Sequence, residues 1–154
     1  METKVKTRTK LVKNYVQAVG RRRSAVARVR LYSGAGKIEI GGKEYKKGDM
    51  IVNDLLITDF FKFKAFAPRY NKMLLDMKVE DKFVISAKVV GGGNHGQLEA
   101  FLLGIARSLD KFDTETYHDS LREKGYLTRD SRIRERRKVG NAGKARRKKS
   151  SPKR

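Results

Sequence analysis

The sequence predicts an α/β fold of the α+β kind: a two-layer sandwich in which a mostly antiparallel, four-stranded sheet has helices on one face. Three observations support this prediction. Apolar residues alternate with polar ones near residues 25–31 and 81–90, as in strands. They recur every three or four residues in later segments, as in amphipathic helices. The resulting order of strands, helix, strand, helix and helix is typical of one sheet covered by helices.

Charge divides the 154 residues into three parts. Residues 1–13 carry five Lys or Arg against one acid (+4), and residues 129–154 carry thirteen against two (+11). The residues between them carry twenty against fourteen (+6), which completes the total of +21. We therefore predict a globular domain over residues 14–128, between a basic N-terminal arm and an extended basic C-terminal tail. The Lys-rich arm is interpreted as flexible, with a mitochondrial transit peptide as the alternative.

The first strands are predicted between residues 15 and 45. A turn at residues 33–36 and the segment 37–40 indicate a returning strand, and the next two glycines indicate a second turn before residues 43–45. These segments are interpreted as a meander. The alternation in its first part separates small and aliphatic side chains on one face from arginines on the other: Ala25, Ala27, Val29 and Leu31 against Arg28 and Arg30.

The apolar pattern from residue 50 to 75 fits either a helix or a buried strand. We predict a helix over about residues 50–61, then a short irregular or helical piece with Pro68 near its start. Residues 81–90 are expected to form a central strand, because their second face is also partly apolar.

Two helices are expected after the central strand. The first begins at about Gln97 and has an apolar stripe that ends at Leu109. The second begins at Asp113 or Thr114 and stops at Gly125, which suits a left-handed helix cap.

A glycine-rich loop joins the central strand to the first of these helices. Gly91, Gly93 and Gly96 have the G-x-G-x-x-G spacing of a dinucleotide-binding loop. Such a site requires a second parallel strand, and the chain after Leu109 offers none. Exposed amides at a helix N-terminus also receive RNA phosphates, while glycines equally permit a sharp strand-to-helix turn. The two interpretations are compatible, and we predict that Gly91, Gly92 and Gly93 bind RNA.

Catalytic and metal sites have no positive support in the sequence. There is no cysteine, so disulfides and thiolate ligands are excluded. His95 and His118 lack ligand partners at a recognisable spacing and are interpreted as solvated or RNA-facing. We predict no catalytic residue, no cofactor, no metal and no small-molecule substrate. No apolar run approaches the roughly 18 residues of a membrane span, so we expect a soluble, intracellular protein with no membrane partner.

The basic segments indicate a polyanionic partner, of which nucleic acid is the best match. The tail has too little apolar surface to fold alone, and we expect it to be disordered without RNA. If it were helical, Arg129, Arg132 and Arg136 would share a face. The run Arg21–Arg23 suits phosphates because guanidinium groups bind them as a fork, although a solvated sheet edge is the alternative. The predicted RNA-binding residues are Arg21, Arg22, Arg23, Arg28, Gly91, Gly92, Gly93, Thr128, Arg129, Arg132, Arg136, Arg137, Lys138, Lys144, Arg146, Arg147, Lys148 and Lys149.

Several segments, taken in order, resemble the bacterial form of the small-subunit ribosomal protein nine family. The most specific begins at Gly125 and reads GYLTRDSR, and the others are GRRRSAVARV at 20–29, GKIEI at 36–40, GGG with GQ at 91–97, GIAR at 104–107, ERRKVG at 135–140 and KAR at 144–146.

This resemblance implies a two-layer domain on the head of the small ribosomal subunit, bound to ribosomal RNA and to neighbouring head proteins. It also implies a tail that runs through ribosomal RNA to the peptidyl site, where Lys153 and Arg154 contact tRNA. We therefore expect a structural, non-enzymatic component of a cytoplasmic ribosome, with an organellar ribosome left open. The alternatives are a free-standing basic nucleic-acid-binding or chaperone-like protein, and a nucleotide-using enzyme built on the glycine loop.

Overall fold

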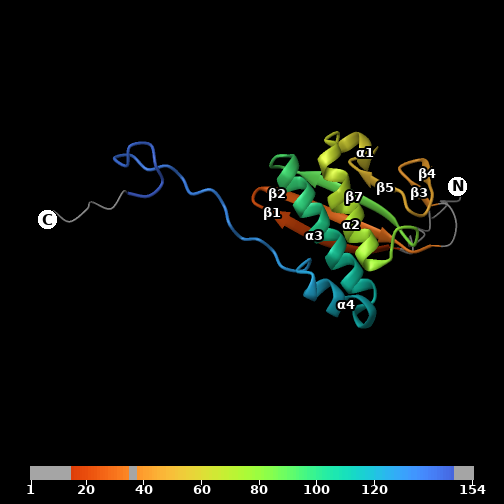
Figure 1. Ribbon diagram of the computed structural model, residues 1–154. Helices are drawn as coiled ribbons and strands as arrows, with labels where there is room; N and C mark the ends of the chain where they lie inside the picture. The colour runs from red at the N-terminus through yellow and green to blue at the C-terminus, as the bar shows by residue number, and fades with distance from the viewer. Residues whose placement is uncertain (1–14, 35–37, 148–154) are drawn as a thin grey trace, which may run out of the picture.

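Figure 1 shows the computed structural model, which describes residues 15–34 and 38–147. The predictions for residues 1–13 and for Lys148, Lys149, Lys153 and Arg154 lie outside these residues. In chain order the elements are β1 (Tyr15–Arg22), β2 (Ala25–Tyr32), β3 (Ile38–Ile40), β4 (Lys43–Tyr45), β5 (Met50–Val52), β6 (Leu55–Leu56), α1 (Ile57–Phe60), a 3-10 turn (Lys64–Phe66), α2 (Ala67–Met77), β7 (Val84–Val90), α3 (Asn94–Phe112) and α4 (Thr114–Glu123).

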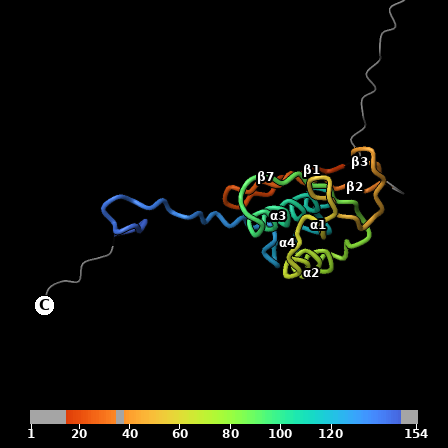
Figure 2. Tube along the Cα trace, turned by 90° about the horizontal axis from the view of Figure 1, so that it is seen from above, coloured from red at the N-terminus to blue at the C-terminus, as the bar shows by residue number. Residues whose placement is uncertain are grey.

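The predicted two-layer α+β architecture is confirmed. The main sheet has the strand order β1-β2-β7-β5-β6, and α2, α3 and α4 all lie on one side of it (Figure 2). β7 is the central strand, as its partly apolar second face predicted. The pairs are antiparallel except for β5 with β7. The sheet has five strands rather than the four expected, because the short strands β5 and β6 were not foreseen.

The predicted meander is wrong in its strand pairing. β2 pairs with β1 on one side and with β7 on the other, so β3 has no place beside it. Instead β3 pairs with β4 in a separate two-stranded sheet. Alternating side chains indicate a strand but do not choose its neighbour. The edge of β2 that β3 would have used in a meander is taken by β7, a strand that lies more than 40 residues further along the chain.

The predicted helix over residues 50–61 is also wrong. The chain forms β5, turns at Asn53 and Asp54, and returns as β6 before the single turn of α1. Both turn residues have positive φ (49° and 66°), a conformation that Asn and Asp tolerate better than most residues. The Asn53 side chain binds both the N–H (2.8 Å) and the C=O (2.9 Å) of Val89, which fastens this turn to β7. The prediction for Pro68 is confirmed, since it lies in the first turn of α2.

The long helix α3 packs directly on β1 and β2 and forms the centre of the core. Leu98, Phe101, Ile105 and Leu109 from the predicted stripe are fully buried. The helix lies so close to β1 that a Cβ atom added at Gly20 would be 1.9 Å from the carbonyl oxygen of Ala100. Backbone therefore contacts backbone here, which holds the middle of α3 against the end of β1.

The last helix, α4, has the boundaries that its sequence predicted. The Asp113 carboxylate accepts a hydrogen bond from the Thr116 N–H (3.2 Å) at its start. At its end the Gly125 N–H binds the carbonyl of Arg122, and the next N–H, from Tyr126, binds that of Leu121. With φ of 73° at Gly125, this is a Schellman cap, and it turns the chain back toward the domain before the tail begins.

Candidate nucleic-acid interface

The sheet face turned away from the helices carries a group of cations, here called the basic sheet face (Arg28, Arg30 and Lys88). Arg28 lies directly opposite Lys88 on the neighbouring strand, and all three side chains are exposed. They line a hollow of about 290 Å³ together with Gln17, Ser86 and one acid, Asp54. Like charges in cross-strand register are locally unfavourable. Among the residues that the structure describes, neither Arg28 nor Lys88 has an ion-pair partner, so an anion from outside would relieve this repulsion.

The predicted RNA-binding residues include Arg28 but not Arg30 or Lys88, which lie on the same sheet face. The signal was available, because alternation had already placed Arg28 and Arg30 on the same strand face. Lys88 required knowledge that β7 pairs with β2. In the structure the Arg30 guanidinium also lies 5.2 Å from the centre of the Tyr15 ring, a cation–π contact that orients it.

A second basic surface forms where the β1–β2 turn meets the glycine loop. Arg23, which is exposed and has φ of 51°, lines a hollow of about 300 Å³ with Gly92, Gly93 and His95. Gly91 and Gly92 adopt φ of 73° and 68° and pack against the backbone of Ser24 and Ala25, so these two glycines serve the strand-to-helix turn. Nothing lies within 4 Å of a Cβ placed on Gly93, the N-cap of α3, which leaves this residue open to a ligand.

The glycine loop does not have the surroundings of a dinucleotide site. Described residues 113–147, which follow α3, contain no strand to complete a second βα unit. The downstream acids are engaged elsewhere, since Asp113 caps α4 and the Asp110 carboxylate binds Nδ1 of His118 (2.7 Å). His118 is thus paired with an acid. The ring of His95 packs edge-on against that of Phe66, with 4.8 Å between the ring centroids. No group of three candidate metal ligands occurs within the described part of the chain.

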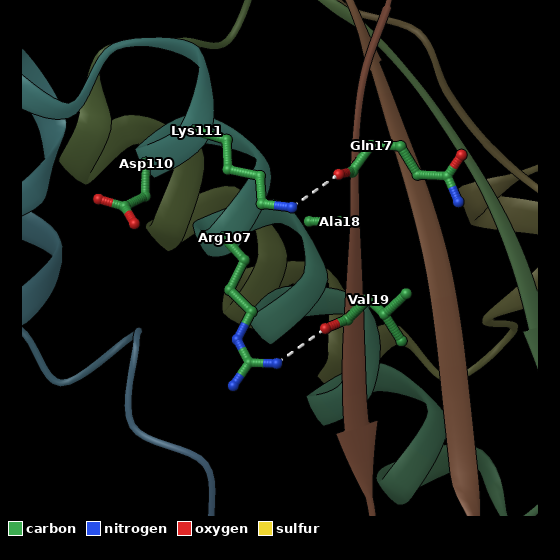
Figure 3. Close-up of a pocket in the computed structure, with 6 residues that line it drawn as sticks. All are labelled: Gln17, Ala18, Val19, Arg107, Asp110 and Lys111. Carbon is green, nitrogen blue, oxygen red and sulfur yellow. Dashed lines mark hydrogen bonds between the residues drawn. The ribbon is translucent and has the colours of Figure 1, made fainter.

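A further hollow, of about 510 Å³, lies along the outer edge of β1, where α3 side chains bind the strand (Figure 3). Nη1 of Arg107 donates to the carbonyl of Val19 (2.9 Å), and Nζ of Lys111 to that of Gln17 (3.4 Å). An edge strand exposes carbonyls that would otherwise attract another strand. These two cations satisfy them, so we assign this hollow a structural role.

Arg22, the middle residue of the arginine run, differs from its neighbours. Arg21 and Arg23 are exposed, but Arg22 is only 8% exposed and lies on the helix side of the sheet. Its Nε binds Glu99 (2.6 Å), and its Nη2 binds the carboxylate of Asp130 (2.8 Å). Its Nη1 donates to the carbonyl of Arg132 (2.7 Å). All three nitrogens are occupied within the protein, so in this structure the phosphate-binding prediction is left to Arg21 and Arg23.

The described part of the tail leaves the domain as an extended chain and then forms a loop (Figure 1). Described residues 129–147 include no helix, so the face that a helical tail would give Arg129, Arg132 and Arg136 does not form. The tail has two acids, and both are used internally. Asp130 binds Arg22 and Arg132, and Glu135 binds Arg146 (2.9 Å).

Apart from Arg132 and Arg146, the tail cations form no ion pair among the described residues. Thr128 is exposed and lines a hollow of about 250 Å³ with Arg21, Arg22 and Tyr126. The tail cations without an ion pair among the described residues are all exposed: Arg129, Arg134, Arg136, Arg137, Lys138, Lys144 and Arg147.

Comparison with known proteins identifies the family. A family model described as Ribosomal protein S9/S16 matches residues 20–154. The chain belongs to this family. The match includes the arginine run, the glycine loop and the whole tail, so the resemblance seen in the sequence is confirmed for the ribosomal protein S9/S16 family.

Curated members of the S9/S16 family show the same relationship. The chain is 41% identical over 128 residues to small ribosomal subunit protein uS9c of Mesostigma viride, covering 82% of this chain and 83% of the relative. It is 36% identical over 123 residues to uS9 of Renibacterium salmoninarum and 40% identical over 126 residues to uS9 of Leifsonia xyli subsp. xyli. In both cases 80% of this chain is covered, and the chain spans 66% of the relative's length.

No helix in the described part of the chain combines the length and the apolar composition needed to cross a bilayer.

Proposed function

We propose that this protein is a structural, RNA-binding component of the small ribosomal subunit, with a folded domain in the subunit head and a tail that reaches peptidyl-site tRNA. The tail carries this proposal: both of its acids are engaged internally, while most of its described cations point outward without partners. Such a chain is suited to neutralise RNA phosphates along its length, since these repeat at regular spacing whatever the base sequence.

The domain supplies the second part of the proposed RNA contact. The basic sheet face and the surface around Arg23 and Gly93 lie on different sides of the β1–β2 hairpin, and both present exposed donors. Phosphate contacts of this kind fix the position of a protein on RNA without reading its sequence. Family membership supports a ribosomal setting, and the names of the curated relatives support the small subunit.

Truncation tests the proposal. Removing Lys153 and Arg154 should weaken tRNA binding at the peptidyl site while the subunit still assembles. Ending the chain after Arg132 should also impair assembly, because many phosphate contacts are lost together. Affinity for small-subunit RNA should then depend less steeply on salt: the magnitude of the negative slope of log affinity against log salt concentration should decrease by about 0.7–0.9 for each phosphate contact removed.

Co-sedimentation separates this function from that of a free-standing nucleic-acid-binding protein. A tail threaded through RNA should keep the full-length protein on small subunits in moderate salt, whereas a surface-bound protein would dissociate. Loss of the full-length chain from subunits under those conditions would refute the proposal. The matched control is the chain ending after Arg132, which we expect to dissociate at lower salt.

A further inference from the structure

We infer that Arg22 is a positioning residue that fixes the direction in which the tail leaves the domain, through a tail-root clamp formed by Arg22, Glu99 and Asp130. One planar guanidinium joins three parts of the chain: its own strand β1, the helix α3 through Glu99, and the start of the tail through Asp130 and Arg132. The inference concerns the free protein. Only its consequence for tRNA rests on the proposed function.

The geometry of the clamp fixes the course of the backbone and not merely a side chain. Nη1 of Arg22 donates to the main-chain carbonyl of Arg132 (2.7 Å) and more weakly to that of Asp130 (3.5 Å). Nη2 binds the Asp130 carboxylate at 2.8 Å. The same carboxylate accepts the N–H of Arg132 (2.9 Å), which closes a tight local turn. Two main-chain carbonyls and one carboxylate at the start of the tail are therefore bound to one rigid group.

Burial distinguishes this contact from an ordinary surface pair. The Arg22 side chain is 10% exposed, against 87% for Arg132, the other arginine on Asp130. A pair that is open to water contributes little, because water screens it and both side chains must be ordered. A cation withdrawn from water must instead keep its partners, since an unpaired buried charge is strongly unfavourable. Losing Asp130 would therefore destabilise the protein more through the buried Arg22 than through the exposed Arg132.

A second fastening lies just before the clamp. The Tyr126 hydroxyl donates to the carboxylate of Asp76 on α2 (2.8 Å), and Nζ of Lys124 lies 3.2 Å from the same group. The tail root, here residues 124–132, is thus attached to α2 at its beginning and to α3 and β1 at its end. The 22 residues beyond it carry most of the tail cations, so the direction of the root decides on which side of the domain these cations begin.

Spin-label distances in the free full-length protein test the clamp. The sequence has no cysteine, so cysteines introduced at the exposed positions Asn71 on α2 and Arg134 in the tail take the two labels alone. We expect Arg22→Ala to broaden the distance distribution at least twofold. Asp130→Ala should broaden it less, because the main-chain carbonyls still bind Arg22.

Matched variants make the result specific to Arg22. Arg21→Ala removes the same charge from an exposed neighbour and should leave the distribution unchanged. Arg22→Lys keeps the charge but lacks the fork, and it should restore the parent distribution only in part. The double variant Arg22→Ala/Asp130→Ala should be no broader than Arg22→Ala, because both changes remove one coupled contact.

Two outcomes would overturn the inference: an unchanged distribution in both Arg22→Ala and Asp130→Ala, or equal broadening by Arg21→Ala. If Arg22→Ala does not fold by circular dichroism, Asp130→Ala decides alone, because Asp130 follows the last helix. Measuring tRNA binding by small subunits that carry Asp130→Ala then separates the two proposals. If the distance distribution of the free protein broadens and tRNA binding weakens, both proposals are supported. If the distribution broadens and tRNA binding is unchanged, the clamp is supported and the proposed role of the tail is contradicted.

Discussion

Asp130 and Glu135 lie five residues apart in the tail, and each binds an arginine, yet their surroundings differ. Asp130 binds Arg22, which is 90% buried against the domain, whereas Glu135 binds Arg146, which is 84% exposed. Glu135 closes a distal loop over residues 135–146, in which the Lys138 N–H also binds the carbonyl of Lys144 (3.2 Å). The root pair joins the tail to the folded domain, while the loop pair joins the tail only to itself.

Both ion pairs have short N···O distances, so their different contributions to stability must come from their different burial. Both carboxyl groups have pKa values below the usual range: hydrogen bonds from Arg132 lower that of Asp130 most, with Arg22 adding to the effect, and a hydrogen bond from Arg146 lowers that of Glu135. Both shifts have the same direction, but only the root pair is partly shielded from water. We therefore expect the root to unfold with the domain and the loop to open independently of it.

The largest predicted effect comes from Gly20→Ala. The new Cβ would lie 1.9 Å from the Ala100 carbonyl oxygen and 2.5 Å from the Gly104 nitrogen, both main-chain atoms, so α3 must move away from β1. We expect a loss of about 3 kcal/mol, hence a fall of about 10 °C in the midpoint of thermal unfolding. Since Glu99 moves with α3, a label at Arg134 should be released in the same transition.

Gly34→Ala is the control for this change. Among the described residues its Cβ would meet only the Ile38 side chain, at 3.8 Å, which is an ordinary contact. The midpoint should therefore stay the same or rise slightly. Circular dichroism measures the domain, and the label mobility measures the root. If the root were released well below the unfolding midpoint in the parent protein, the root and the domain would not be one unit.

A smaller effect is expected from Tyr126→Phe, which removes the hydroxyl bound to Asp76. Loss of one hydrogen bond should cost about 1 kcal/mol, or about 4 °C in the unfolding midpoint. The pH dependence is more specific. Burial and Asp76 raise the pKa of Tyr126 to about 12, while hydrogen bonds from Tyr126 and Lys124 lower the pKa of Asp76.

The directions of these two pKa shifts set the pH range over which the hydrogen bond between Tyr126 and Asp76 stabilises the protein. The raised pKa of Tyr126 means that its contribution is complete below the unfolded value of 10.0 and is lost as the pH rises to about 12. The lowered pKa of Asp76 means that its contribution is complete above 3.8 and is lost as the pH falls further. Tyr126→Phe should therefore reduce the loss of stability at both extremes. Leu127, which is not bonded to Asp76, offers the conservative control Leu127→Met, whose pH profile should match that of the parent protein.

Sequence predicted most reliably where the information is local. Gly125 was identified as a helix cap because a left-handed residue must follow a helix whose last carbonyls need donors, and the stripe that ends at Leu109 was identified by its period. The helix predicted over residues 50–61 failed for the opposite reason. Its apolar residues suit both periods, and the choice is made by the distant backbone of Val89, which binds Asn53.

The candidate site divides in the same way. The exposure of Arg28 is predicted correctly by alternation along its strand, since this depends only on neighbours in the chain. Arg22 could not be separated from Arg21 and Arg23 by composition, because its role depends on Glu99 and Asp130, which are 77 and 108 residues away. Adjacent side chains in β1 point to opposite faces of the sheet, so Arg22 lies on the buried face and Arg21 on the exposed one.

The smallest effect on stability is expected from Glu135→Gln. This substitution tests whether the distal loop opens independently of the tail root. The amide keeps the shape of the side chain but loses the charge that binds Arg146, so the distal loop should open while the unfolding midpoint of the domain stays within about 1 °C. Hydrogen exchange at the Lys138 N–H should become faster, since the pair between Glu135 and Arg146 no longer keeps the loop closed around its hydrogen bond to Lys144. Asp130→Asn is the paired variant: it should loosen the root yet leave exchange at Lys138 unchanged. Faster exchange at Lys138 in Asp130→Asn would show that the root and the loop are coupled, and the distinction between them would fail.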